Sequence, residues 1–446
     1  MTKLRDSFHK IVTDLSGSLH SSYQIGFVRG HDYLNEQQVA LIRTVLNSRD
    51  GEEVVREYEN QLAALIGPGR GVSFAAGRMA FYAVLKALGV GSNDEVILPG
   101  FTCSVMPNAV WRTGARPVFA DIEAETFGSC ASGIVPKITS RTKAVVAQHS
   151  FGIPCNIPEI VEVCRKRGIA LIEDCAITLD SAYDEKKVGN WGDAAIFSTD
   201  HSKPLNTLVG GFFYTRDETL SEKVRTTCEA APQLSQDHQS RLFQQFLLER
   251  QYYQPENYRR RLALHYLRKL SKKIWRTGNQ PVFMEKDYNK PLPNYAEAEY
   301  PYPAKMPPFL SRLGLIELAR WGQESLRRKE LLKDYLCLTR GGGWGHYLPK
   351  AYENRHLDIV PLRFVFTHPE AKKLTRKMSK FIDVSWTWFR RPIICTDSIE
   401  AFGYANGSCP KAERIGSEII NWPCVISKEW RQLLLENYKN LVSSNL

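Results

Sequence analysis

Hydrophobic positions in the first half of the chain alternate between short apolar runs and longer segments with helical spacing. The runs are typical of buried strands, and the longer segments are typical of amphipathic helices that pack against them. The predicted strands lie at 72–76, 95–98, 116–120, 144–147, 169–172 and 194–197. The predicted helices lie at 36–66, as a pair, and at 79–88, 107–113 and 158–167. Because short apolar strands alternate with helices, the pattern predicts a parallel sheet covered by helices on both faces.

The character of the sequence changes after residue 215. Residues 216–300 are polar and have mostly helical spacing, and the proline-rich stretch 279–308 is typical of an extended connector. Helical spacing returns at 309–336 and ends at the three glycines 341–343. We therefore predict four parts: an N-terminal arm (1–34), a large domain (35–215), a helical basic insertion with a connector (216–308), and a linking helix with a smaller α+β C-terminal domain (309–446).

Composition indicates the class of protein and the cellular compartment. The chain has 446 residues, of which 43% are hydrophobic and 24% charged, as in ordinary globular proteins. No segment has the apolar length of a membrane span, and the first residues lack the apolar core of a signal peptide. The 10 cysteines are scattered without a Cys-x-x-Cys pair, so the sequence predicts a cytoplasmic protein with neither a disulfide framework nor a metal site. The net charge of +11 favours anionic partners.

Candidate catalytic residues follow the predicted strands. Ligand groups gather at the carboxyl ends of parallel strands, where Gly77, Asp174 and Lys203 are expected. Asp174 ends a predicted strand, and Lys203 follows in a Ser-rich turn. A pyridoxal phosphate enzyme needs this arrangement, because its lysine forms a Schiff base with the cofactor aldehyde and its aspartate keeps the ring nitrogen protonated.

Several segments in order resemble the DegT/DnrJ/EryC1/StrS family of pyridoxal phosphate enzymes, which are chiefly aminotransferases acting on nucleotide-linked keto-sugars. The resemblance covers roughly residues 35–215 and 310–445. Its segments are 77–88, 94–102, 114–121, 149–152, 172–174, 188–193, 197–203, 313–320, 409–414 and 421–424. It implies an α/β protein of fold type I: a large cofactor-binding domain with a mostly parallel, seven-stranded-type sheet covered by helices, plus a smaller α+β C-terminal domain.

The resemblance also implies a role for each matching residue. Lys203 would form the Schiff base and move the proton, and Asp174 would pair with the ring nitrogen. His149 would either lie beside the ring or serve as a structural histidine with its hydrogen bonds satisfied. The cofactor phosphate would bind at the start of the helix after the first strand, where free N–H groups favour an anion. The residues implied for it are Gly77, Arg78, Met79 and Ser198.

Three positions depart from the family pattern. Arg78 stands where members have Thr or Ser, and its guanidinium could clamp the phosphate as a bidentate donor. Cys103 replaces the aromatic residue that stacks on the ring, which leaves stacking to Phe101. Ile177 replaces a glutamine and removes a polar contact to the ring. These changes leave the prediction of the cofactor intact.

The resemblance implies a cytoplasmic, homodimeric aminotransferase of nucleotide-sugar and polysaccharide biosynthesis. It would take the amino group of glutamate and pass it to a keto-sugar by a ping-pong mechanism. One alternative is a pyridoxal phosphate-dependent dehydratase or lyase on a related sugar, but the family's sugar dehydratases replace the lysine that this chain keeps as Lys203. The other alternative is a cofactor-binding regulator or scaffold, which Cys103 and Ile177 keep open.

Two segments carry signals of their own. Residues 258–276 hold eight basic residues and no acidic one, with apolar residues on the opposite side of a predicted helix. This helix either lies peripherally on an anionic membrane at the inner face or packs on the body with a solvated basic face. We expect no nucleic acid to bind, because aromatic residues are not interleaved with the charges. The aromatic and basic stretch 386–391 either packs in the core or lines the mouth of the substrate site.

Overall fold

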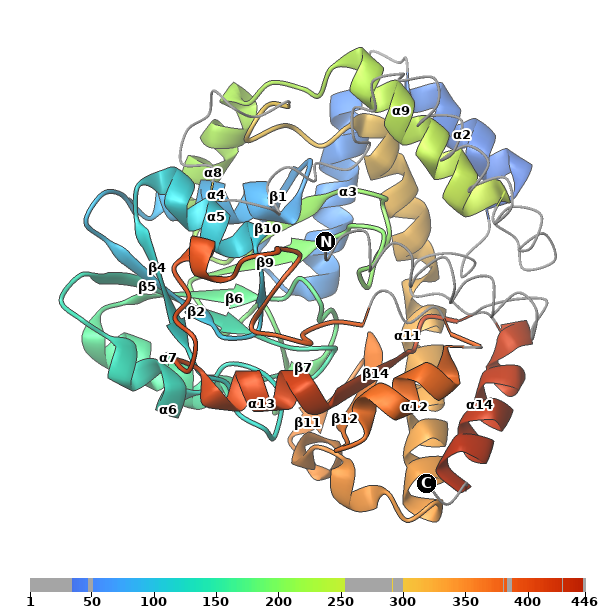
Figure 1. Cartoon of the computed structure of the whole chain (residues 1–446). Coiled ribbons are helices and arrows are strands. Elements are labelled where there is room, and N and C mark those ends of the chain that lie inside the picture. The colour runs from blue at the N-terminus through green and yellow to red at the C-terminus, as the bar shows by residue number, and fades with distance from the viewer. Residues whose placement is uncertain are drawn as a thin grey trace, which may run out of the picture.

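The computed structural model describes residues 34–46, 51–252, 291, 300–379, 381–382, 387–426 and 428–443. Figure 1 gives the order of the elements along the chain. Residues 1–33 of the predicted arm lie outside the described residues, and so does the whole basic segment 258–276. Within the described part of the chain, no helix combines the length and the apolar character needed to cross a membrane.

A seven-stranded sheet forms the centre of the large domain. Its order is β1 (Arg70–Phe74), β10 (Gly211–Thr215), β9 (Ala194–Ser198), β6 (Ala170–Asp174), β5 (Thr142–Gln148), β2 (Glu95–Pro99) and β4 (Arg116–Ala120). The five strands from β9 to β4 are parallel, whereas β10 runs antiparallel to both β1 and β9. The predicted mostly parallel sheet is confirmed. Strand β10 was not predicted, and it reverses direction because a loop rather than a helix joins it to β9.

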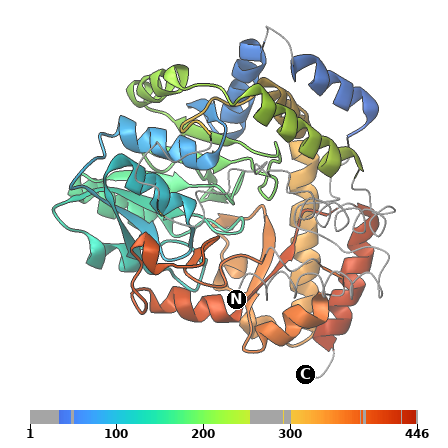
Figure 2. The same cartoon turned by 45° about the horizontal axis from the view of Figure 1, so that its top comes forward.

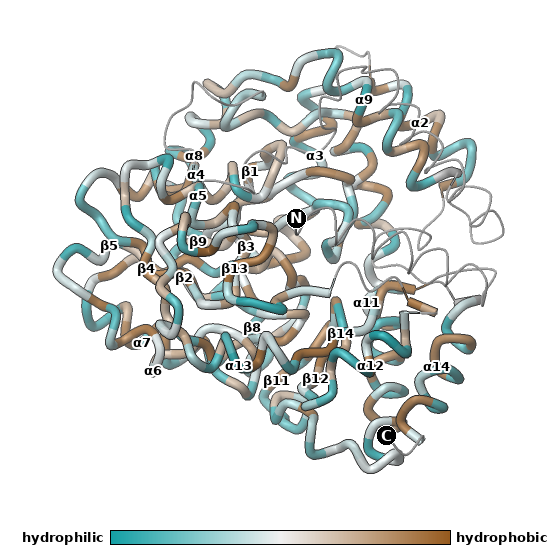
Figure 3. Tube along the Cα trace, viewed as in Figure 1, coloured by the Kyte–Doolittle hydropathy of each residue, from teal (hydrophilic) through white to brown (hydrophobic). Residues whose placement is uncertain are grey.

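Helices cover both faces of this sheet, as the apolar pattern predicted. In β5, Ala144 and Val146 belong to one buried cluster with α4 (Gly77–Ala87) and α5 (Val105–Thr113). Val145 and Ala147 belong to a second cluster with α7 (Ile157–Arg167) and α6 (Ala131–Ile134). Figure 3 shows hydrophobic residues along the central strands. Side chains alternate between the faces of a strand, so a strand buried on both faces is apolar throughout.

A long helix links the large sheet to the C-terminal region. Helix α11 (Pro308–Gly341) spans 34 residues and packs against α3 (Gly51–Ile66) and α2 (Glu36–Leu46). In both Figure 1 and Figure 2 it runs from these helices down to the C-terminal helices. Its lower part contributes Leu331, Leu332 and Tyr335 to a separate core, which also holds β12 (Arg363–Thr367), β14 (Ile419–Pro423), α12 (Ala371–Met378) and α14 (Lys428–Ser443).

Smaller elements complete this part of the fold, and some of them reach the carboxyl ends of the central strands. Strand β3 (Thr102–Cys103) pairs in parallel with β13 (Ile393–Ile394), although these segments are far apart in sequence. Helix α8 (Glu218–Ala230) leads to α9 (Gln236–Leu247), which continues as the π-helical segment Leu248–Tyr252. Helix α13 (Pro410–Glu418) precedes β14. The C-terminal part of the chain and the start of the insertion therefore both reach the edge of the sheet where ligands are expected.

Candidate active site

A pocket of about 530 Å³ opens at the carboxyl ends of β6 and β9, beside the first turn of α4. The structure brings seven of the ten predicted site residues to its wall. These are Gly77, Arg78, Cys103, Asp174, Ile177, Ser198 and Lys203. They come from four separate segments of the chain, and the parallel order of β6 and β9 brings Asp174 and Ser198 to the same edge of the sheet.

Lys203 lies in the loop that joins β9 to β10. Its N–H donates to the carbonyl of Asp200 at 2.9 Å, and the Asp200 carboxylate accepts from the N–H and the hydroxyl of Ser202. The loop is closed by a 2.6 Å hydrogen bond between the hydroxyls of Thr199 and Thr207. The Lys203 ammonium lies 4.4 Å from the ring centroid of Trp388. The loop thus holds the only lysine among the residues described on the pocket wall, and an aromatic face stabilises its positive charge.

Asp174 is the last residue of β6 and is 3% exposed. Burial raises the pKa of its carboxyl group, while the N–H of Ala176, 2.9 Å from Oδ1, and the charge of Lys203 act in the opposite direction. A buried carboxylate without full compensation is costly. The site therefore favours a ligand that places a positive or proton-donating group against Asp174.

The start of α4 forms a recess next to Ser198. The residue before the helix, Ala76, provides no side-chain cap for the first turn. A Cβ atom on Gly77 would lie 3.2 Å from the Cβ of Ser198, so any side chain here would fill the recess. A Cβ on Gly211 would come within 2.3 Å of the Gly77 nitrogen, so the start of β10 lies directly against the start of α4. Uncapped N–H groups at a helix start suit an anion, and the guanidinium of Arg78 lines the same wall.

Two predicted residues lie behind the wall. Met79 is fully buried, and its sulfur accepts a hydrogen bond from the N–H of Ala304 at 3.3 Å. Phe101 stacks on Phe389, with ring centroids 5.1 Å apart and planes at 10°. Since Phe389 lines the pocket and Phe101 does not, Phe101 acts on a ligand only by supporting Phe389.

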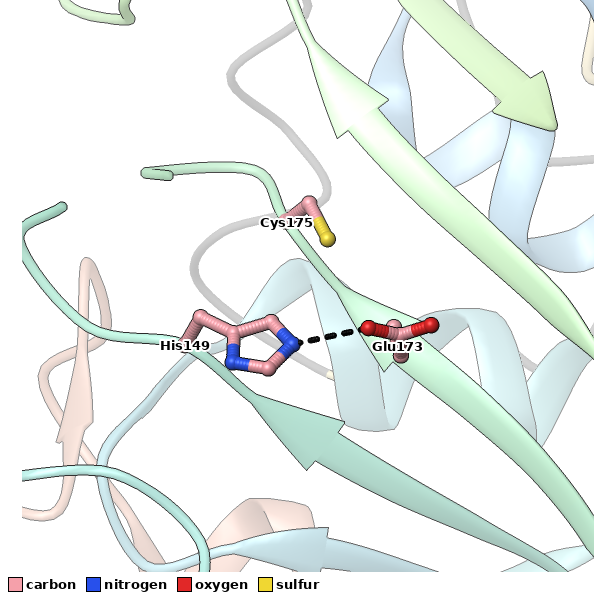
Figure 4. Close-up of side chains that lie close together, drawn as sticks. All are labelled: His149, Glu173 and Cys175. Atoms are coloured by element: carbon pink, nitrogen blue, oxygen red, sulfur yellow. Dashed lines mark hydrogen bonds and ion pairs between the residues drawn. The ribbon is translucent and has the colours of Figure 1, made fainter. Parts of the chain in front are cut away.

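His149 is also placed away from the pocket wall, in a buried cluster with Glu173 and Cys175 (Figure 4). Its Nδ1 accepts from the N–H of Cys155 at 3.1 Å, so its Nε2 carries the proton and donates to Glu173 at 3.0 Å. The Glu173 carboxylate accepts three further hydrogen bonds, from the N–H groups of residues 189, 191 and 192.

These bonds determine what the cluster in Figure 4 can do. Its ligand atoms lie within 4.8 Å of one another, close enough for a metal ion. However, neither ring nitrogen of His149 offers a free lone pair, and burial raises the pKa of the Cys175 thiol well above its ordinary value. The cluster is therefore held by hydrogen bonds that tie β5 and β6 to the loop 188–193.

Aromatic residues from the C-terminal region complete the pocket. Trp388 lies between two cations, the Lys203 ammonium and the Arg363 guanidinium, which is 3.6 Å from the Trp388 ring centroid. Trp388 and Phe389 line the pocket, whereas Arg390 is exposed. Both interpretations of segment 386–391 hold for Trp388 and Phe389, which are buried in the large hydrophobic core and also line the pocket. Residue 386 lies outside the described part of the chain.

A histidine–carboxylate pair on the pocket wall was missed at the sequence level. Nδ1 of His201 lies 3.2 Å from Glu249 Oε2, and Gln245 donates to Glu249 Oε1 at 2.6 Å. Glu249 lies in the π-helical segment, and π-helical turns often occur at functional sites. No local motif marks Glu249, because it reaches the pocket only through the packing of the insertion.

Two buried arginines hold the loop that carries Lys203. Arg328 on α11 donates to the carbonyl of Pro204 at 3.0 Å and pairs with Glu324 at 2.7 Å. Arg250 donates to the carbonyl of Asn206 at 3.0 Å and pairs with Glu317, also on α11. The long helix therefore fixes the backbone that follows Lys203, and Arg328 acts as a positioning residue.

Replacing Arg328 with methionine should lower the free energy of unfolding by about 3 kcal/mol, because it breaks a buried ion pair and leaves the Pro204 carbonyl without this donor. The matched control is Arg327→Met. Arg327 pairs with the same Glu324 at 2.6 Å, but its side chain is 42% exposed whereas that of Arg328 is 2% exposed. The control should lose less than about 1 kcal/mol. Urea unfolding of both variants measures the difference. Equal losses of unfolding free energy would contradict the role of Arg328 in holding the Lys203 loop.

The fold and the pocket define a class of protein. Solved structures with the same fold include an aminotransferase from Psychrobacter cryohalolentis, with a TM-score of 0.69 and 17% identity over 93% of this chain and 98% of that chain. A putative sugar aminotransferase from Streptococcus pneumoniae matches with a TM-score of 0.66 and 20% identity, over 94% of this chain and 98% of that one. The architecture is that of fold type I enzymes, as the resemblance implied.

The sequence comparison finds related proteins for the first half of the chain. Residues 32–245 match the model of the DegT/DnrJ/EryC1/StrS aminotransferase family. GDP-perosamine synthase of Escherichia coli O157:H7 is 36% identical over 192 residues, which are 43% of this chain and 51% of that protein. UDP-N-acetyl-3-dehydro-alpha-D-glucosamine 3-aminotransferase of Acidithiobacillus ferrooxidans is 38% identical over 171 residues, 38% of this chain and 46% of that protein. The chain thus spans about half the length of the curated relatives it matches.

Proposed function

We propose that this protein is a pyridoxal phosphate-dependent aminotransferase that moves the amino group of glutamate onto a nucleotide-linked keto-sugar. One observation carries the proposal: a lysine, a buried strand-end aspartate and an uncapped helix start line the same pocket. Relatives named as nucleotide-sugar aminotransferases support the choice of substrate class.

The residues present fit this cofactor. When bound, pyridoxal phosphate would supply an aldehyde that accepts an amino group and a ring that accepts electrons. Its phosphate would bind at Gly77, Arg78 and Ser198, where a Cβ atom would block the recess. Its ring nitrogen would donate to Asp174, offsetting the burial that raises the pKa of that carboxyl group.

Lys203 would do the work at the reacting carbon. Its amine would hold the cofactor in the resting enzyme, and once released it would move a proton at the substrate carbon. The aromatic wall of Trp388 and Phe389 would exclude water from this amine. Because an enzyme of this type releases one product before binding the second substrate, the kinetics would be ping-pong. The presence of Lys203 supports this reaction over a dehydratase that lacks the lysine.

The setting of the enzyme is also part of the proposal. We infer a homodimer in the cytoplasm, because the family resemblance implies a site built at a dimer interface. The same resemblance supports the division of the chain into a large cofactor-binding domain at 35–215, an insertion and connector at 216–308, and a linking helix with a small domain at 309–446. The Cys103 and Ile177 positions would leave the ring with thinner contacts than in typical members.

The test separates an aminotransferase from a cofactor-binding regulator. Protein reconstituted with pyridoxal phosphate should release about one 2-oxoglutarate per site when given glutamate alone, since the first half-reaction needs no acceptor. A panel of nucleotide-linked keto-sugars should then restore continuous 2-oxoglutarate release with the correct acceptor. Omitting the cofactor is the control. Cofactor bound without any release from glutamate or another amino acid would favour the regulator.

A further inference from the structure

The cysteines fall into two groups by exposure. All ten are described, and seven are buried: Cys130, Cys155, Cys164, Cys175, Cys228, Cys409 and Cys424. Burial raises the pKa of each of these seven thiols, which keeps them protonated and unreactive. The other three, Cys103, Cys337 and Cys395, are reachable from solvent. Two of these three, Cys103 and Cys395, line the pocket that holds Lys203.

Backbone pairing brings Cys103 and Cys395 together. In the parallel pair β3–β13, Ile394 is the partner of Cys103, and Cys395 is the next residue. The N–H of Ser104 donates to the carbonyl of Ile394 at 3.1 Å, which fixes this register. Because Cys395 lies one residue beyond that partner, a strand spacing of about 4.8 Å and a rise of about 3.3 Å per residue place its Cα roughly 6 Å from that of Cys103, within the range of about 4.4–6.8 Å that a disulfide spans. Cys395 also has a positive φ of 67°, a conformation rare outside glycine.

The two thiols have opposite roles in one hydrogen bond. The pKa of Cys103 is lowered to about 7, first by a hydrogen bond from the Cys395 thiol, although burial acts in the opposite direction. The N–H of Val105 and the charges of Lys203 and Arg78 lower it further. The same hydrogen bond, together with burial, raises the pKa of Cys395 well above its ordinary value. Cys103 is therefore the acceptor and the nucleophile, and Cys395 is the proton donor.

We propose that Cys103 and Cys395 form a thiol modification site in the cofactor pocket, which takes low-molecular-weight disulfides. The Cys103 thiolate attacks one sulfur of the small disulfide, forms a mixed disulfide and releases one small thiolate. The mixed disulfide removes the Cys103 thiolate, whose hydrogen bond and charge had kept Cys395 protonated. Cys395 then attacks the Sγ of Cys103, gives its proton to the departing small thiolate and closes a Cys103–Cys395 disulfide. The two cysteines lose two electrons, and the small disulfide is reduced to two thiols.

Because Cys103 and Cys395 line the cofactor pocket, a disulfide between them would change the charge and the backbone links of that pocket. A disulfide removes the negative charge of the Cys103 thiolate beside Lys203 and Arg78, and it links β3 covalently to the segment after β13. The effect on amino-group transfer rests on the proposed function. The thiol chemistry does not, so the two can fail separately.

The experiment follows the covalent products on the full-length protein. Reduced protein, freed of reductant, is treated with oxidised glutathione, then mapped by peptide mass spectrometry. Wild type should lose two hydrogens and give linked peptides containing Cys103 and Cys395. Cys395→Ser should stop at glutathione on Cys103, because nothing resolves the mixed disulfide, and Cys103→Ser should give neither product. Cys337→Ser is the matched control and should behave as wild type. Absence of the linked peptides from wild type overturns the proposal.

A rate measurement keeps the test independent of how well the variants fold. With a chromogenic aromatic disulfide at pH 7, wild-type Cys103 should react about fivefold faster than a thiol of ordinary pKa, because its larger thiolate fraction outweighs its lower intrinsic nucleophilicity. Cys337, which is exposed on α11 and lies outside the pocket wall, is the thiol compared with it in the same chain. Cys395→Ala should move the midpoint of the pH–rate curve upward, since the hydrogen-bond donor is gone. Equal rates at Cys103 and Cys337 would also overturn the proposal.

Discussion

Replacing Lys203 with alanine should lower the rate of amino-group transfer by at least roughly 10⁴-fold, the upper range for loss of a positioned proton-transfer group. No other lysine is described on the pocket wall, so no described residue of the wall can replace its amine. Lys203→Arg should be equally inactive. Arginine keeps the positive charge beside Trp388, but it stays protonated and can neither bind the aldehyde nor pass a proton. The single-turnover release of 2-oxoglutarate from glutamate measures the loss.

A chemical label tests the same residue without relying on turnover. Borohydride reduction of the protein with bound pyridoxal phosphate should fix the cofactor to a peptide containing Lys203. Lys223→Ala is the control, because Lys223 is exposed on α8 and should change neither the label nor the rate. Attachment to another lysine would contradict the assignment of Lys203.

Asp174→Asn should lower the transfer rate by roughly 10²–10³-fold, the loss expected when one buried electrostatic partner of the reacting group is removed. An amide cannot hold the ring nitrogen protonated, whereas the phosphate contacts at Gly77 and Ser198 should keep the cofactor bound. The control is Asp237→Asn, since the Asp237 side chain is 76% exposed and lies on α9. Normal turnover of the Asp174 variant would exclude Asp174 as the partner of the ring.

Thermal unfolding of the cofactor-free protein gives a second readout for Asp174. Burial raises the pKa of its carboxyl group above the ordinary value of 3.8. The folded protein therefore holds this proton more tightly than the unfolded chain, and its stability falls as pH rises from that ordinary value through the raised one. Above that range the charged Asp174 costs stability, and a neutral amide of the same size does not. At pH 7 the cofactor-free Asn variant should have a Tm no lower than that of wild type.

The local pattern of apolar and polar residues was enough to predict most strands and helices of the large domain. Apolar runs located six strands of the central sheet, and helical spacing located the helices that cover it, because strands buried on both faces must be apolar along their whole length. Strand β10 was not predicted from the pattern, although all of its residues are buried. Its direction depends on the loop at Lys203, which the alternation of strands and helices does not describe. The same alternation placed Asp174 and Lys203 at one edge of the sheet.

The sequence by itself therefore determined the parallel sheet and the residues at the strand ends, since each depends on neighbours in the chain. Only the tertiary structure decided which distant side chains join them. Trp388, Glu249 and Arg328 reach the Lys203 loop from a C-terminal segment, an insertion and the long linking helix. It also decided that His149 bonds to Glu173 behind the pocket and that Cys395 lies beside Cys103. Such contacts depend on how separate elements pack, and no spacing along the chain encodes the register of β3 on β13.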